Sequence, residues 1–256
     1  MPRDLTAPAM PAPDAVTPDV AARINALNAF AEGRDARAIL SRALEEGPMA
    51  LVSSFGADSV VLLHLLSTLA PDLPVLFLDT QMLFAETLDY QRALARDLGL
   101  TNVQTLRPDP EALLARDADN ILHLAEPDAC CALRKTEPLD RTLAPYAGWI
   151  TGRKRFQTGT RAALPTFEAE GGRLKVNPLA GWSPAALAAH IKAHSLPRHP
   201  LVARGYRSLG CAPCTTPVRA GEDPRAGRWR GREKTECGIH FEGGRARPGR
   251  AAKGAP

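Results

Sequence analysis

The chain lacks any run of about 18 apolar residues, the length that a helix needs to cross a lipid bilayer. Its first 20 residues also lack the apolar core of a secretory signal. We therefore expect neither membrane insertion nor export, and we predict a cytoplasmic protein. A strong excess of one charge is missing too, because 32 Lys and Arg stand against 28 Asp and Glu. The mild surplus favours small anionic ligands over a nucleic-acid surface.

Cysteine is scarce and its count is odd. Five cysteines in 256 residues, in a chain with no sign of export, argue against a disulfide framework and for metal binding or thiol chemistry. Internal repeats are absent as well. The composition, 45% hydrophobic and 23% charged, is typical of one globular domain with at most an appendage.

Four segments are predicted along the chain. Residues 1–20 are rich in Pro and Ala and residues 243–256 in Gly, Arg and Ala, so both are expected to be disordered ends. Residues 21–200 alternate strand and helix patterns, which predicts an α/β nucleotide-binding domain: a mostly parallel twisted sheet with helices on both faces. In residues 201–242 the periodicity fades into Gly-, Pro- and Arg-rich loops, which should bind a ligand or fold over a site.

Individual strands and helices can be predicted from apolar runs and from the Gly and Pro residues that end them. The expected strands lie within residues 49–56, 73–80, 102–108, 148–154 and 174–179. The expected helices lie within residues 22–33, 35–47, 57–70, 84–100 and 183–196, the last with Ser183 as its N-cap and Pro184 at its first position.

The turn SSFGADS, residues 53–59, joins an apolar strand to an apolar helix. Small residues there let backbone N–H groups approach an anion, and the helix N-terminus adds positive potential, so phosphate or sulfate would fit. Neither the Walker pattern nor GxGxxG is present. An ordinary strand-to-helix connection is the alternative. The turn resembles the SGGxDS-like loop of the adenine-nucleotide α-hydrolase group. This resemblance implies the PP-loop type of α/β fold found in that group.

The second buried strand ends at Asp79 and Thr80, where ligands collect in open α/β sheets. A purely structural role, with Asp79 capping the next helix, is the competing interpretation.

Four cysteines form two pairs, Cys130-Cys131 and Cys211-x-x-Cys214. Four thiolates suit either a structural zinc ion or an iron–sulfur cluster. Zinc pairs are usually two to four residues apart, whereas adjacent cysteines can take different corners of a cubane, so the spacing favours a 4Fe-4S cluster and leaves zinc open. Inert buried cysteines are a third interpretation.

Cys237, the fifth cysteine, belongs to neither pair and lies in the stretch KTECGIH between Lys234 and His240. A thiolate is the competent nucleophile, and nearby basic groups lower a thiol pKa. The alternative is an inert surface cysteine.

Basic residues flank both cysteine pairs. Lys135 follows Cys131 by four residues, which on a helix would place it one turn away on the same face. Guanidinium groups match phosphate and sulfate oxygens in bidentate fashion, although most basic residues in any protein are simply solvated. The candidates are Arg153, Lys154, Arg155 and Arg161 in one stretch and Arg225, Arg228, Arg230 and Arg232 in another.

Together these pieces resemble the assimilatory sulfonucleotide reductases, specifically the bacterial adenylylsulfate (APS) reductases. The likeness covers about residues 50 to 240 and is carried by SSFGADS, LDTQMLFAET, CCALRKTEPL, WITGRKRFQT, VNPLAGWS, GYRSLGCAPCTTPV, GEDPRAGRW and KTECGIH. It implies reduction of APS to sulfite and AMP, in sulfate assimilation towards cysteine biosynthesis. The implied reductant is thioredoxin or a glutaredoxin-like protein.

The resemblance also implies roles for individual residues. Cys237 would attack the sulfur of APS and become an S-sulfocysteine. The 4Fe-4S cluster would be held by Cys130, Cys131, Cys211 and Cys214. The nucleotide pocket would be lined by Ser54, Gly56, Ser59, Asp79 and Thr80. The phosphosulfate would be bound by Lys135, Arg153, Arg155, Arg161, Arg225, Arg228 and His240.

Three other functions are weighed against this one. A reductase of the 3′-phosphorylated substrate PAPS, or a dual enzyme, is the nearest, but such reductases commonly lack the two cysteine pairs. A zinc-stabilised nucleic-acid-binding protein would be colourless and bind in a salt-sensitive way. An ATP pyrophosphatase or tRNA sulfurtransferase would leave KTECGIH unexplained. A homo-oligomer is compatible with the sequence, which does not predict the oligomeric state.

Overall fold

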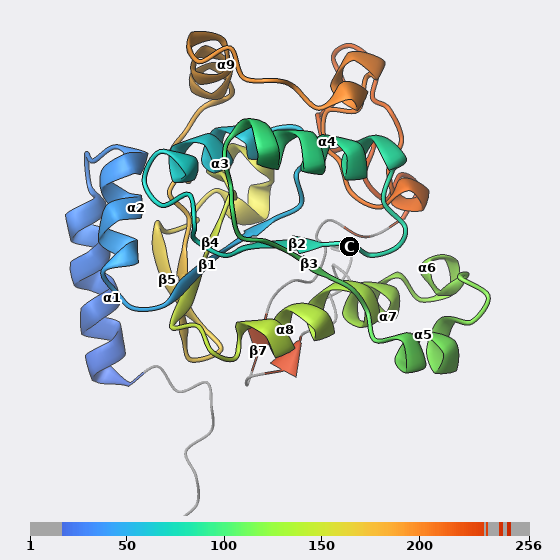
Figure 1. The fold of residues 1–256 in the computed structure, drawn as a ribbon, viewed down its shortest axis with the longest axis horizontal. Helices are drawn as coiled ribbons and strands as arrows, with labels where there is room; N and C mark the ends of the chain where they lie inside the picture. The colour runs from blue at the N-terminus through green and yellow to red at the C-terminus, as the bar shows by residue number, and fades with distance from the viewer. Residues whose placement is uncertain (1–16, 233, 235–240, 243–244, 247–256) are drawn as a thin grey trace, which may run out of the picture.

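A computed structural model of the chain describes residues 17–232, 234, 241–242 and 245–246 (Figure 1). Six strands form one sheet in the order β3-β2-β1-β4-β6-β5, in which every neighbouring pair is parallel except β5 with β6. The strands are β1 (Met49–Ser53), β2 (Val75–Leu78), β3 (Val103–Leu106), β4 (Gly148–Thr151), β5 (Phe167–Glu170) and β6 (Arg173–Val176). A short hairpin, β7 (Phe241–Glu242) with β8 (Arg245–Ala246), stands apart from this sheet.

Helices fill the connections between the strands. They are α1 (Pro18–Ala31), α2 (Ala36–Leu44), α3 (Ser59–Ser67), α4 (Ala85–Asp97), α5 (Pro110–Asp117), α6 (Leu122–Ala125), α7 (Pro127–Cys131), α8 (Glu137–Leu143) and α9 (Pro184–Ala193). A π-helical turn, Ala132–Thr136, joins α7 to α8. Short 3₁₀ turns occupy Arg155–Gln157, Gly159–Arg161, Pro200–Arg204 and Ala212–Cys214. In the part of the chain that the structure describes, none of these helices has the length and apolarity to span a membrane.

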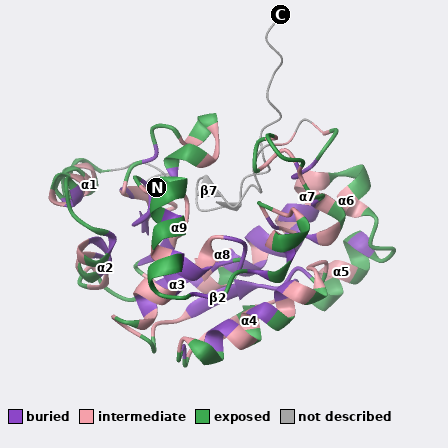
Figure 2. Cartoon of the chain, turned by 90° about the horizontal axis from the view of Figure 1, so that it is seen from above, coloured by how far each residue is buried: buried purple, intermediate pink, exposed green. Residues whose placement is uncertain are grey.

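Helices cover both faces of the sheet, as predicted. One face packs against α1, α2, α3, α4 and α9 in a single apolar cluster. The other face packs against α8, whose Leu139 and Leu143 contact Ala50, Leu76 and Trp149. Figure 2 shows the resulting burial, with β2 buried between the two helical layers. The predicted Ser183 cap of α9 is confirmed, since its hydroxyl oxygen accepts from the N–H of Ala186 at 3.1 Å.

Two parts of the fold differ from the sequence prediction. Helix α1 begins at Pro18, so residues 18–20 belong to a helix and not to a disordered end. The reason is a local cap, because the Thr17 hydroxyl accepts from the N–H of Val20 at 3.4 Å. Strand β5 was missed. It pairs antiparallel with β6 through a turn at Gly171 and Gly172, whose φ values of 56° and 74° suit glycine.

The loop-rich segment after α9 packs back onto the sheet edge. Leu201 and Leu209 are buried against Ala57, in the turn that follows β1. The rings of Phe84 and Tyr206 meet edge to face with centroids 5.3 Å apart. These contacts place the described part of the segment, up to residue 232, over the carboxyl ends of the strands.

Candidate active site

A cleft of about 1190 Å³ lies at the carboxyl ends of β1 and β4. Residues at the ends of the two strands line it, among them Ser53 at the end of β1, Ser54 after it and Gly152 after β4. From β1 the sheet extends to β2 and β3 on one side and to β4 on the other. Such a reversal of strand order is where ligands bind in open α/β sheets.

The turn after β1 supplies three cleft residues predicted from the sequence, Ser54, Gly56 and Ser59. Between them Phe55 has a left-handed φ of 48°, a conformation that is uncommon for residues other than glycine. Its ring is fully buried and meets Phe77 edge to face, with centroids 5.4 Å apart. Its backbone N–H donates to the Ser53 hydroxyl at 3.1 Å. The buried Phe55 ring therefore fixes the turn, and the small residues of the turn line the cleft.

Basic side chains outnumber acidic ones along the cleft. Asp58 and Asp223 are its acidic residues. The basic ones are Lys135, Arg153, Lys154, Arg161, Lys175, Arg198, Arg207, Arg225 and Arg228. Five of these were predicted as substrate ligands, and Lys154 was among the basic candidates of the 153–161 stretch. Lys175, Arg198 and Arg207 were missed. A lining of this kind favours an anionic ligand.

Two lysines of the cleft, Lys154 and Lys175, are almost fully buried. Lys154 is 2% exposed, and its ammonium lies 3.6 Å from the Asp58 carboxylate. Burial lowers the pKa of Lys154, although Asp58 works in the opposite direction. Lys175 is paired with Glu170 and lies 5.3 Å from the centre of the Trp149 ring. Burial and the charge of Arg153 lower the pKa of Lys175 to about 8, so its charge titrates close to neutral pH.

Two predicted substrate ligands do not line the cleft. Asp79 accepts from the side chain of Arg107 at 3.0 Å and from the N–H of Gln81 at 2.9 Å. Arg155 donates through Nε to the carbonyl of Leu164 at 2.8 Å. Both side chains hold neighbouring loops in place. Asp79 does not cap the next helix, because the N-cap of α4 is Phe84.

A second, much smaller cavity is lined by all four paired cysteines, Cys130, Cys131, Cys211 and Cys214. The first pair lies at the end of α7. The second pair lies at the 3₁₀ turn Ala212–Cys214, where the loop-rich segment passes over the carboxyl ends of the strands. That crossing is fixed by a β-bridge between Leu83 and Cys211 and by the N–H of Ala212, which donates to the carbonyl of Met82 at 2.7 Å. The fold therefore joins two pairs that are far apart in sequence.

Arg134 locks the first pair to the sheet. Its side chain is 1% exposed and forms an ion pair with Asp117 at 2.5 Å. It also donates to the carbonyl of Thr80 at 3.0 Å and to the side chain of Asn120 at 2.8 Å. Breaking a buried pair of this kind costs about 3–5 kcal/mol. The sequence reasoning missed Arg134, since nothing in its spacing separates it from surface arginines.

The environment of the thiols fits a metal centre. All four are free cysteines, and three are buried. Burial, together with the neighbouring thiols of Cys131 and Cys211, raises the pKa of Cys130 to about 12. Burial and Cys211 likewise raise the pKa of Cys214. Four thiolates can share this cavity only with a positive centre to compensate them.

The spacing of the four sulfurs can be compared with what one zinc ion requires. A tetrahedral zinc ion with bonds of about 2.3 Å holds its sulfurs about 3.8 Å apart. No three of these four described cysteines bring their sulfurs within 4.8 Å of one another. Three of these sulfurs would therefore have to move closer together to bind one zinc ion.

The cleft and the cysteine cavity share Lys135 and Cys211, which line both. Lys135 was expected one α-helical turn from Cys131. It lies instead on the π-helical turn, where the i→i+5 bonding widens the spacing, and it still borders the cysteines. Arg228 makes a further connection, because its guanidinium lies 4.4 Å from the ring centre of Trp229, a residue of the cysteine cavity.

Cys237 and His240 lie outside the described residues. Lys234, three positions before Cys237, is described and forms an ion pair with Asp128 on α7. Its ammonium also lies 5.8 Å from the centre of the Trp229 ring. The chain that leads towards Cys237 therefore passes beside the cysteine cavity.

Known proteins share this sequence and this fold. The family model of the phosphoadenosine phosphosulfate reductase domain matches residues 48–217. An adenosine 5′-phosphosulfate reductase from Mesorhizobium japonicum is 55% identical over 203 residues, which cover 79% of this chain and 80% of that protein. One from Chelativorans sp. is 53% identical, covering 80% and 83%.

Among solved structures, a phosphoadenylyl-sulfate (PAPS) reductase from Candida auris in a phosphate complex is 26% identical. It superimposes with a TM-score of 0.66 over 75% of this chain and 96% of its own. The match of fold, family model and relatives has one conclusion: the chain belongs to the phosphoadenosine phosphosulfate reductase family, the sulfonucleotide reductases.

Proposed function

We propose that the chain reduces adenosine 5′-phosphosulfate (APS) to sulfite and AMP, with thioredoxin or a glutaredoxin-like protein as the electron donor. The observation that carries this proposal is the contact between the two cavities. A large cleft with nine basic side chains adjoins the cavity of the four paired cysteines, called the cysteine cage below. Lys135 and Cys211 line both. The names of the relatives at 53–55% identity agree with APS as the substrate.

The cleft would bind the nucleotide by its anionic end. The turn at Ser54, Gly56 and Ser59 offers backbone N–H groups and the N-terminus of α3 to phosphate oxygens. Arginines and lysines around the rest of the rim would bind the phosphosulfate, and they would stabilise the charge that develops on AMP as it leaves. Because these groups are already in place, little reorganisation is needed during the reaction.

Cys237 would supply the nucleophile. Its thiolate attacks the sulfur of the phosphosulfate, a new S–S bond forms, and the bond from that sulfur to the bridging oxygen breaks, so that AMP leaves with the electron pair. The product is an S-sulfocysteine. A thiol of thioredoxin then attacks the Cys237 sulfur and releases sulfite, and a second thioredoxin thiol resolves the mixed disulfide. The substrate sulfur gains the two electrons that the thioredoxin dithiol loses.

The four paired cysteines would hold a 4Fe-4S cluster, which supplies a local field to the adjacent substrate site when it is bound. Lys135 is placed to respond to that field, since it lines the cage and the cleft together. Cys237 is then the one cysteine left for covalent chemistry. A reducing compartment, the cytoplasm, suits both roles because all five thiols must stay reduced.

The test is sulfite release from APS and from PAPS, with reduced thioredoxin, by protein purified without oxygen. We expect APS to be strongly preferred, and we expect Arg161→Ala to raise KM, because Arg161 lines the cleft. The matched control is Arg96→Ala, an exposed arginine on α4 that is ion-paired with Asp97 away from the cleft. A preference for PAPS would replace the proposal with PAPS reduction, and no sulfite from either nucleotide would refute it.

A further inference from the structure

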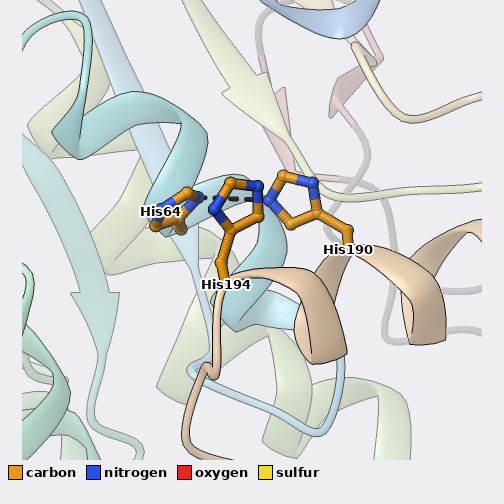
Figure 3. A group of neighbouring side chains, drawn as sticks. All are labelled: His64, His190 and His194. Atoms are coloured by element: carbon orange, nitrogen blue, oxygen red, sulfur yellow. Dashed lines mark hydrogen bonds between the residues drawn. The ribbon is translucent and has the colours of Figure 1, made fainter.

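Three histidines gather where α3 and α9 pack together, away from both cavities (Figure 3). His64 comes from α3, while His190 and His194 lie one turn apart at the end of α9. One nitrogen of each ring can be chosen so that all three lie within 4.8 Å of one another. His64 Nδ1 and His190 Nε2 are 3.1 Å apart and share a hydrogen bond.

We propose that His64, His190 and His194 bind one divalent transition-metal ion of the zinc, nickel or copper class. Neutral imidazole is a ligand that suits these ions. Two histidines four residues apart on one helix face are a known way to grip such an ion, and His190 and His194 have that spacing.

The distances are close to those of a coordinated ion. Zinc bonded to imidazole nitrogens at about 2.0–2.1 Å holds the nitrogens about 3.3–3.4 Å apart in a tetrahedral arrangement. The His64–His190 pair is already near this value, and the third nitrogen lies within 4.8 Å of both. Small side-chain rotations would close the site without moving either helix.

The hydrogen bond between two of the rings shows how their nitrogens share a proton. The hydrogen bond between His64 and His190 uses an N–H on one ring and a lone pair on the other. Burial lowers the pKa of both rings, and the charge of His194 lowers it further. The neutral form of these two rings is therefore favoured. When a metal binds, the donating ring moves its proton to its other nitrogen and offers a lone pair.

The surroundings allow an ion to enter and keep it oriented. His194 is exposed, so solvent reaches the site and water can complete the coordination. Trp182 packs edge to face on His190 with centroids 5.5 Å apart, which limits the rotation of that ring. Three protein ligands and one open position are a common arrangement for zinc.

A metal here would fasten two walls of the nucleotide cleft to each other. Helix α3 supplies Ser59 and Leu62 to the cleft, and α9 supplies Leu187 and Ala188. The histidines themselves line neither the cleft nor the cysteine cavity. The site is thus a cross-link between α3 and α9, independent of the cysteine cage and of the reaction proposed above.

The test is a zinc titration by calorimetry on the full chain, purified without oxygen and carrying Cys237→Ser to remove the remaining thiol. We expect one equivalent to bind and to raise the midpoint of thermal unfolding. His194→Ala should weaken the binding at least about 100-fold, because even the loss of a supporting hydrogen bond costs 10- to 100-fold. Lys192→Ala, an exposed neighbour on the same helix, is the control and should bind as the parent does.

Binding that is unchanged in His194→Ala would overturn the proposal, since the zinc would then sit elsewhere. So would the absence of a stoichiometric site in the parent. His190→Ala provides a second check on the ligand set and should lose the same site, whereas unfolding curves without zinc show whether each variant is folded. Equal loss of binding in Lys192→Ala would also count against the three histidines as ligands.

Discussion

The hydroxyl oxygen of Thr80 lies 3.2 Å from the sulfur of Cys211. The backbone carbonyl of Thr80 meanwhile accepts from Arg134, on the π-helical turn that follows Cys130 and Cys131, at 3.0 Å. One residue just after β2 therefore contacts Cys211 directly and, through Arg134, the turn that follows the first cysteine pair. Because Thr80 also lines the cleft, the edge of the sheet sets the position of the cage relative to the substrate site.

Thr80→Val keeps the shape of this side chain and removes its hydroxyl. With a cluster bound, the hydrogen bond to the Cys211 sulfur would stabilise the more negative, reduced state, and the variant would lose that bond. We expect the reduction potential to fall by about 40 mV, equivalent to about 1 kcal/mol for one hydrogen bond. Electrochemical titration measures the change. Thr105→Val, at an exposed position on β3, is the control, and an equal shift there would show that the effect is not local.

Serine substitutions should separate the cage from the nucleophile. Cys130→Ser and Cys214→Ser each remove one ligand from the cysteine cavity, so both should lose iron and the broad visible absorption of a cluster. Cys237→Ser should keep the iron and the colour while losing turnover. Iron, sulfide and zinc analysis of the three variants checks this. Stoichiometric zinc in a colourless parent protein would favour the zinc interpretation instead.

Gly210 leaves room for Arg228. A β-carbon at position 210 would lie 2.3 Å from a terminal nitrogen of Arg228, whose guanidinium now donates to the carbonyl of Leu209 at 2.9 Å. Gly210→Ala should push this arginine out of the cleft and raise KM about 10- to 100-fold, the loss expected for one hydrogen bond to a charged group. Gly159→Ala is the steric control, because nothing lies within 4 Å of its β-carbon position. An unchanged KM for Gly210→Ala would show that Arg228 does not contact the substrate.

The lowered pKa of Lys175 should make the free energy of unfolding depend on pH. Its pKa of about 8 in the folded protein is lower than its ordinary value of 10.5. Below pH 8 the lysine is charged in both states, and the folded state bears the cost of burying the charge. Between about pH 8 and 10.5 the unfolded state binds more protons, so stability rises with pH.

Replacement by Lys175→Met removes this dependence. We expect the free energy of unfolding of the parent, measured relative to Lys175→Met, to rise by about 3 kcal/mol across that interval. Denaturant unfolding at several pH values measures it. A flat difference between parent and variant would show that the lysine is not buried as a charge.

Much of the fold could be predicted because its signals are local. The runs that became β1 and β2 are apolar and end in small residues, and the Ser183–Pro184 start of α9 is a complete helix signal by itself. Strand β5 was missed because Glu168 and Glu170 interrupt the apolar pattern. The GlyGly pair after it was the available signal for a hairpin.

The site was predicted less completely for a physical reason. Residues 53–59 and the cysteine pairs are recognisable by spacing, but Lys175 faces the cleft only because of the direction and register of β6. Its neighbours in the sequence are typical of a lysine at the surface or on an edge strand. The H-x-x-x-H spacing of His190 and His194 was visible in the sequence, whereas the approach of His64 depends on how α3 and α9 pack.

The most direct test of the central claim omits thioredoxin. The parent protein, incubated with APS alone, should release one equivalent of AMP and gain the mass of one sulfonate group on the peptide that contains Cys237. Adding reduced thioredoxin should then release sulfite and restore the original mass, and Cys237→Ser should do neither. Sulfite release without any sulfonated peptide, or sulfonation at one of the four paired cysteines, would contradict the account.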